Sequence, residues 1–258
     1  MDKRFTFQDS EGRRISAVLS SPPAPTDKIV ILCHGFLGSK DSWTNRTLSE
    51  RLATHQIATL RFDFFAHGQS GGELKDLLLT TLVAQTQSVM ALMRGHGFAH
   101  MALLGSSFGG LVATLVAAKH PTLEALALRC PVSDFPALLR QQFGNAAIEL
   151  WRRLGQVPSS VAPVPVHYRF LEDCERHDVR QAAQALRMPT IIVHGDRDEV
   201  IPLSQSEELY GQVRAEKALH IIPGADHRFS SPEHFTHVSE LLVGWLARYL
   251  STGVAAAS

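Results

Sequence analysis

Cysteine and net charge are both scarce in this sequence. Three cysteines in 258 residues (Cys33, Cys130 and Cys174) are too few and too scattered for a disulfide framework or a zinc site. Lysine plus arginine and aspartate plus glutamate each number 25, so no charge excess favours nucleic acid or an anionic membrane. The first residues also lack the apolar core of a secretory signal. These absences predict a soluble cytoplasmic protein with no nucleic-acid or membrane partner, and they leave its oligomeric state open.

The apolar residues fall into short runs that alternate with helical patterns. The β-branched run 29–33 is typical of a strand buried on both faces of a parallel sheet. We expect further buried strands at 57–62, 101–104, 123–130, 188–193 and 218–222. Between and after them, helices are expected at 43–55, 78–93, 109–118, 204–213 and 232–250. With an N-terminal hairpin at 3–9 and 13–19, the pattern predicts an α/β fold whose mostly parallel sheet is covered on both faces.

The uncharged stretch 101–118 allows a second interpretation. It approaches the length of a transmembrane span, and Gly105 and Gly109 have the spacing of a helix-pairing motif. A central strand followed by a buried helix would be equally free of charge. The alternation along the remaining chain favours the strand and helix over the membrane span.

One long segment interrupts the alternation. Residues 133–186 contain no convincing buried strand, and such a length is too great for an ordinary loop. Active-site lids are often insertions of this kind. We therefore expect residues 1–132 and 187–258 to form the core and residues 133–186 to form a small cap over the carboxyl edge of the sheet.

The sequence from Gly105 to Gly109, Gly-Ser-Ser-Phe-Gly, matches the Gly-x-Ser-x-Gly pattern of a nucleophile elbow. In this turn between strand and helix, the central residue has a strained backbone and its hydroxyl stands clear of the sheet. A Cβ atom at either glycine would collide with a neighbouring element. Ser107, the central residue, is therefore the candidate nucleophile, and Ser106 is not.

A serine nucleophile needs a base, and the base needs an orienting acid. Asp198 follows the expected strand 188–193, and His227 follows the strand 218–222, so both lie at carboxyl strand ends where sites form. Asp196 is the rival acid, and Asp226 is interpreted as a turn residue. His234 and His237 have a spacing that could bridge a metal, but no further ligand completes a set, so no metal is expected.

Two backbone amides are candidates for an oxyanion hole. The amide of Phe108 begins the helix after the elbow, where the helix dipole favours negative charge. The amide of Phe36, in the His34-Gly35-Phe36 turn after strand 29–33, is the candidate second donor. His34 itself is interpreted as a residue that braces this loop.

Several motifs together carry a family resemblance. They are His34-Gly35-Phe36, the stretch 63–70, Gly105–Gly109, the stretch 194–198 with Pro202, and Gly224-Ala225-Asp226-His227. These motifs resemble those of serine hydrolases with the α/β-hydrolase fold. The His-Gly-Phe-x-Gly-x-Lys opening and the compact cap resemble the bacterial cinnamoyl/feruloyl esterase group. Ser106 and Phe108 depart from the residues common in that group, which leaves the triad intact and the subfamily open.

The resemblance implies a carboxylic-ester hydrolase that acts on small or medium esters, including esters of aromatic acids, through a Ser-Asp-His triad and no cofactor. Phe143, Trp151, Tyr168 and Phe170 are expected to wall the substrate pocket, the alternative being that they only anchor the cap. A peptidase, a thioesterase or a carbon–carbon hydrolase would use the same triad. A ligand receptor with low turnover stays open as well, whereas dehalogenase chemistry is disfavoured because the elbow carries serine in place of aspartate.

Overall fold

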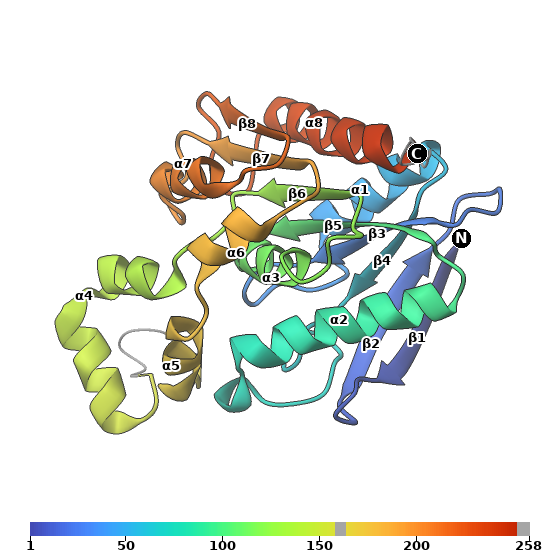
Figure 1. The fold of residues 1–258 in the computed structure, drawn as a ribbon. Coiled ribbons are helices and arrows are strands. Elements are labelled where there is room, and N and C mark those ends of the chain that lie inside the picture. Colours follow the sequence, from blue (N-terminus) through green and yellow to red (C-terminus); the bar gives the residue numbers. More distant parts are fainter. Residues whose placement is uncertain (158–163, 252–258) are drawn as a thin grey trace.

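A single mixed sheet forms the centre of the computed structural model, which describes residues 1–157 and 164–251. The strands are β1 (Asp2–Gln8), β2 (Arg14–Ser20), β3 (Lys28–Cys33), β4 (Ala58–Phe62), β5 (His100–Ser106), β6 (Ala125–Arg129), β7 (Thr190–Gly195) and β8 (Lys217–Ile222). Their spatial order is β1-β2-β4-β3-β5-β6-β7-β8 (Figure 1). β1 and β2 are antiparallel to their neighbours, and the six strands β3 to β8 are parallel to one another. The expected N-terminal hairpin therefore forms the edge of the sheet.

Helices cover both faces of this sheet. They are α1 (Trp43–Thr54), α2 (Leu79–Gly95), α3 (Phe108–Ala117), α4 (Phe135–Leu154), α5 (Arg169–Glu175), α6 (Val179–Ala185), α7 (Leu203–Gln212) and α8 (Pro232–Ser251), with a short 3₁₀ helix at Leu74–Asp76. α2 and α3 lie on one face, and α1 and α8 lie on the other (Figure 1). This arrangement confirms the doubly covered α/β sheet.

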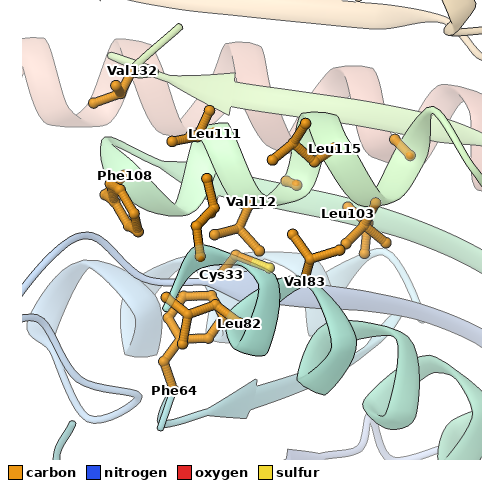
Figure 2. Packing of buried hydrophobic residues seen from close by; sticks show 14 of the residues in the cluster. Cys33, Phe64, Leu82, Val83, Leu103, Phe108, Leu111, Val112, Leu115 and Val132 are labelled. Atoms are coloured by element: carbon orange, nitrogen blue, oxygen red, sulfur yellow. The ribbon is translucent and has the colours of Figure 1, made fainter. Parts of the chain in front are cut away.

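The alternation of side chains along the central strands creates two separate cores. In β3, Ile29 and Ile31 face the core under α2 and α3, whereas Val30 and Leu32 face the core under α1 and α8. Because successive strand residues point to opposite faces, a strand covered on both sides must be apolar throughout. Figure 2 shows the first core, where α3 packs against α2 and the strands through Cys33, Leu82, Val83, Leu111, Val112 and Leu115.

The uncharged stretch 101–118 is a strand, a turn and a helix. Most of it belongs to β5 and α3, both buried inside the sheet and its covering layer. Over residues 1–157 and 164–251, no helix combines the length and the apolar character that crossing a membrane requires.

Three helices occupy the long connection between β6 and β7. α4 begins after Asp134, whose carboxylate accepts the amide of Ala137 at 2.8 Å, and it is kinked at Gly144 (φ 78°, ψ 157°). α4 and α5 lie beyond the carboxyl ends of the parallel strands, on the left of Figure 1, whereas α6 packs against α3 and α7. α5 is tied to α2 because Asp173 accepts hydrogen bonds from both the amide and the hydroxyl of Thr80, each at 2.8 Å.

α3 approaches the sheet closely because glycines lie at its contacts with the strand ends. A Cβ atom on Gly109 would lie 2.2 Å from the carbonyl oxygen of Cys33 and 2.4 Å from that of His34. One on Gly105 would lie 2.5 Å from the carbonyl oxygen of Gly109. The obstructing atoms belong to the backbone and cannot rotate away, so the two glycines set the distance between α3 and the ends of β3 and β5.

We expect Gly109→Ala to destabilise the fold by about 3 kcal/mol, because the added methyl forces α3 away from β3. The matched control is Gly244→Ala in α8, where a Cβ atom meets nothing within 4 Å. That variant should be neutral or more stable by up to about 1 kcal/mol, since alanine is the better helix former. Urea unfolding of both variants measures the difference, and equal stabilities would contradict the close-approach argument.

Candidate active site

Ser107 occupies a strained turn between β5 and α3. Its backbone has φ 53° and ψ −123°, a region that residues other than glycine rarely adopt. Neighbouring backbone holds it there, because its amide donates to the carbonyl of Arg129 at 2.9 Å and its carbonyl accepts the amide of Val132 at 3.1 Å. Ser106 is buried at the end of β5. The turn therefore presents the side chain of Ser107, as the Gly-x-Ser-x-Gly pattern predicts.

Asp198 and His227 meet across the loops that follow β7 and β8. The Nδ1 atom of His227 lies 2.7 Å from Oδ2 of Asp198. The Asp198 carboxylate is fully buried, while 13% of the His227 side chain is exposed. Ser107 and His227 line the same cavity, so the structure brings together the three residues that the sequence singles out.

The rival acids have other partners. Asp196 is exposed, and its Oδ1 accepts the amide of Gly224 at 2.6 Å, which ties the two loops together. Asp226 accepts the amide and the hydroxyl of Ser230 at 2.7 and 2.6 Å, the turn role expected from sequence. Asp198 is thus the carboxylate that contacts the His227 ring.

A second imidazole, which the sequence argument missed, contacts Asp198. Nε2 of the fully buried His194 lies 3.2 Å from Oδ2 of Asp198 and 3.0 Å from the carbonyl of Ile201. Burial alone would raise the pKa of Asp198, but hydrogen bonds from His194, His227 and the Ile201 amide hold it well below its usual range. Asp198 is therefore a carboxylate at neutral pH, suited to orient an imidazole. The position of His194 at the end of β7 was the available signal.

The two candidate oxyanion donors flank Ser107. Phe108 is the first residue of α3, so its amide has no acceptor within the helix. Phe36 follows Gly35, where a Cβ atom would come within 3.2 Å of Cβ of Ser107. His34 braces this turn, because one ring nitrogen accepts the amide of Phe64 at 3.1 Å and Nδ1 donates to the carbonyl of Gly35 at 2.8 Å. Phe36, Ser107 and Phe108 all line the same cavity.

Comparisons with known proteins agree with the fold. A family model described as the alpha/beta hydrolase fold matches residues 28–153, and one described as serine aminopeptidase S33 matches residues 164–231. A solved structure of Est1E from Butyrivibrio proteoclasticus with bound ferulic acid is similar over 96% of this chain and 99% of its own, with a TM-score of 0.85 and 23% identity. The chain has the α/β-hydrolase fold.

Among curated relatives, this chain is similar to a monoacylglycerol lipase from Mycolicibacterium smegmatis, with 24% identity over 95% of this chain and 97% of the relative. It is also similar to the human mitochondrial palmitoyl-protein thioesterase ABHD10, with 22% identity over 71% of this chain and 61% of the relative.

A buried ion pair fastens the loop that carries Phe36. Nζ of Lys40 lies 2.6 Å from Oδ2 of Asp63, and the Lys40 amide donates to Oδ1 of the same carboxylate at 2.7 Å. Both side chains are almost completely buried, and Gln69 completes the group by accepting from Nζ at 2.8 Å. A multiply hydrogen-bonded buried pair can offset its desolvation cost, and it resists movement. Both residues lie in motifs that carry the family resemblance, but the sequence alone indicated no role for either.

The cavity in front of Ser107 is small and mainly apolar. Its volume is about 340 Å³. Among the residues that the structure describes, the polar ones on its wall are Ser107, Gln142, His227 and Arg228, and the others are aromatic or aliphatic. Of the four aromatic residues expected to wall a pocket, Phe143, Trp151 and Phe170 line it. The fourth, Tyr168, packs edge-on against Trp151 with ring centroids 5.7 Å apart and is not among the described lining residues.

Potential metal ligands also lie near the site. Cys130, Asp198 and His227 offer ligand atoms within 4.8 Å of one another. Asp198 and His227 already bond to each other, and burial raises the pKa of the Cys130 thiol, which favours its protonated form. A metal would have to displace both the thiol proton and this hydrogen bond, so we assign none.

Burial lowers the pKa of His34 to about 4, so its ring is neutral in the folded protein at pH 7. The unfolded chain binds this proton near pH 6.5. Between these values the unfolded state holds more protons, so the stability contributed by neutral His34 is present above pH 6.5 and is lost as pH falls toward 4. We expect the free energy of unfolding to fall by about 2 kcal/mol between pH 7 and 4.5 from this group.

Urea unfolding across that range measures the change, and NMR titration of the His34 ring measures its midpoint directly. A midpoint near 6.5 would contradict the assignment of a buried, neutral His34.

Proposed function

We propose that the chain is a serine carboxylic-ester hydrolase with Ser107, Asp198 and His227 as its catalytic triad. The observation that carries the proposal is one cavity lined by both Ser107 and His227, with the His227 ring held from behind by a buried carboxylate at 2.7 Å. A serine in a strained turn and a histidine with a fixed tautomer are the parts that acyl transfer requires.

In the acylation step, His227 Nε2 takes the hydroxyl proton of Ser107 as Oγ attacks the ester carbonyl carbon. The carbonyl electrons move to the oxygen, which the amides of Phe36 and Phe108 stabilise. When this intermediate collapses, the bond to the alcohol breaks and His227 gives its proton to the departing oxygen. The Asp198 carboxylate stabilises the transient imidazolium and does not take its proton.

In the deacylation step, water replaces the alcohol. His227 removes a proton from water as the water oxygen attacks the acyl carbon, and collapse then breaks the bond to Oγ of Ser107. The same proton returns to the serine and the acid departs. Each step balances without a cofactor or metal.

The cavity supports a small or medium acyl group, aromatic or aliphatic. A volume of about 340 Å³ is at the lower end of the range for ligand pockets, and its wall is mainly apolar. The likeness to Est1E with ferulic acid and to a monoacylglycerol lipase also supports an ester of an apolar acid. The polar residues Gln142 and Arg228 on the cavity wall would face the alcohol part of the ester.

We also propose that residues 133–186 act as a cap on a core of residues 1–132 and 187–258. α4 and α5 supply Phe135, Leu138, Phe143, Trp151 and Phe170 to the cavity wall. The side chain of Gln142 donates to the carbonyl of Val200 at 2.9 Å, which joins α4 to the loop that carries Asp198. Such a contact would close one side of the cavity.

Thioester hydrolysis is the second candidate function. The likeness to a palmitoyl-protein thioesterase and the apolar cavity favour it, and the same acyl-enzyme chemistry would serve. Sulfur is the better leaving group, so an esterase site can cleave both bonds.

Hydrolysis of p-nitrophenyl esters from acetate to laurate, together with methyl ferulate and an acyl thioester, tests the function. We expect turnover of the short and medium esters, and a loss of at least about 1,000-fold in kcat for Ser107→Ala. Full activity in that variant would refute the serine mechanism. An unreactive wild type would refute the esterase proposal, and amide and carbon–carbon substrates would follow.

Two aspartates in the same loop offer a matched test of which carboxylate orients His227. Asp198→Asn should lower kcat by about 10,000-fold, because an amide favours the wrong imidazole tautomer. Asp196→Asn keeps the oxygen that accepts the Gly224 amide and should retain kcat within about threefold. Equal losses in both variants would show that the loop, and not the buried carboxylate, carries the effect.

A further inference from the structure

Arg129, the last residue of β6, lies between the strands that lead to Ser107 and Asp198. It is paired with Ser106 of β5 on one side and with Val193 of β7 on the other. Its carbonyl accepts the amide of Ser107 at 2.9 Å. The main chain of Arg129 therefore already fixes the elbow.

The side chain of Arg129 reaches the loop that carries His227. Nη2 donates to the carbonyl of Arg228 at 2.6 Å and lies 3.3 Å from the carbonyl of His227. The guanidinium also stands over the ring of Phe229, with 4.8 Å from Cζ to the centroid. One residue thus contacts the backbone of both the candidate nucleophile and the candidate base.

Stability alone does not account for this side chain. Only 7% of Arg129 is exposed, its Nε has no hydrogen-bond partner among the described residues, and no carboxylate of that set lies within 4.0 Å of its nitrogens. By contrast, buried Arg61 pairs with Asp2 at 2.7 Å. Burying an unpaired cation costs free energy, which two carbonyl bonds and a ring contact only partly offset.

The charge of Arg129 acts on a crowded set of groups. Asp198 lies in the loop after β7. Asp226, His227 and Arg228 belong to the loop after β8, and Cys130 is the residue that follows Arg129. His194 contacts Asp198 from the other side. Burial lowers the pKa of Arg129, while Asp198 and Asp226 favour its charged form. The guanidinium is a cation at neutral pH, so its attraction to these two carboxylates also holds it against the loops after β7 and β8.

We propose that Arg129 is a positioning residue that holds the His227 loop in register with Ser107. This inference rests on the proposed role of His227 as the base. Removing Arg129 would leave both reacting groups in place but loosen the alignment between them.

Arg129→Met, Arg129→Lys and the control Arg13→Met test the proposal. Arg13 also combines hydrogen bonds with an aromatic contact, to Asp9 and the Phe65 ring, but it lies outside the site. For Arg129→Met we expect kcat to fall about 10- to 100-fold with KM within about twofold, since a displacement near 1 Å has this cost. Arg13→Met should keep the wild-type kcat and KM.

Arg129→Lys retains the charge but loses the planar pair of donors. We expect it to recover only part of kcat with an unchanged KM, and it also serves if the methionine variant does not fold. A wild-type kcat in a folded Arg129→Met or Arg129→Lys protein would overturn the proposal.

A measurement without substrate separates this proposal from the proposed function. The low-field proton resonance of the His227–Asp198 hydrogen bond should be sharp in the wild type and broadened in Arg129→Met. If the wild type hydrolyses no ester but the resonance still depends on Arg129, the function fails and the positioning stands. An unchanged resonance in Arg129→Met contradicts the positioning role whatever the activity.

Discussion

The backbone strain at Ser107 is the constraint on which the rest of the site depends. A conformation of this kind costs about 1–3 kcal/mol and persists only when its surroundings hold it. Six residues other than glycine have positive φ in the described ranges, and five of them (Leu37, Ala66, Ser107, Cys130 and Phe229) lie in the turns that follow β3, β4, β5, β6 and β8. The strain therefore gathers at the carboxyl edge of the sheet, where the remaining fold is rigid enough to support it. The close approach of α3 through Gly109 and the buried Lys40–Asp63 pair help to hold the turns at this edge in place.

The second constraint is electrostatic. A carboxylate as buried as Asp198 is costly unless hydrogen bonds replace the water that it loses. Two imidazoles and two backbone amides, those of Val200 and Ile201, supply these bonds. Since His194 is fully buried and has contacts to Ser206 and the Ile201 carbonyl, its ring is fixed, whereas the other face of the His227 ring opens toward the cavity. The same carboxylate thus has one structural partner and one partner available for chemistry.

Much of the fold and the position of each proposed triad residue could be predicted, because both follow from local patterns. Ser107, Asp198 and His227 each come after a short apolar strand, and parallel strands bring their carboxyl ends to one edge. The partners of these residues could not be predicted in the same way. Lys40 and Asp63 meet across 23 positions, and the contacts of His194 and Arg129 join segments that are distant in the sequence or folded back by a loop. The spacing of aromatic residues in 133–186 did not indicate which of them line the cavity. Phe170 lines it, whereas Tyr168, two positions earlier, packs against Trp151.

The aromatic residues of the cavity join substrate binding to the proposed oxyanion donors. The ring of Phe170 in α5 stacks on that of Phe36, with centroids 6.0 Å apart, and Phe135 in α4 contacts the ring of Phe108 edge-on at 4.8 Å. The amides of Phe36 and Phe108 belong to the same residues as these rings. An acyl group that pushes on α4 or α5 therefore also pushes on the backbone proposed to stabilise the oxyanion. Because oxyanion stabilisation depends on donors placed within a few tenths of an ångström, substitutions in α4 and α5 act on kcat as well as on substrate preference.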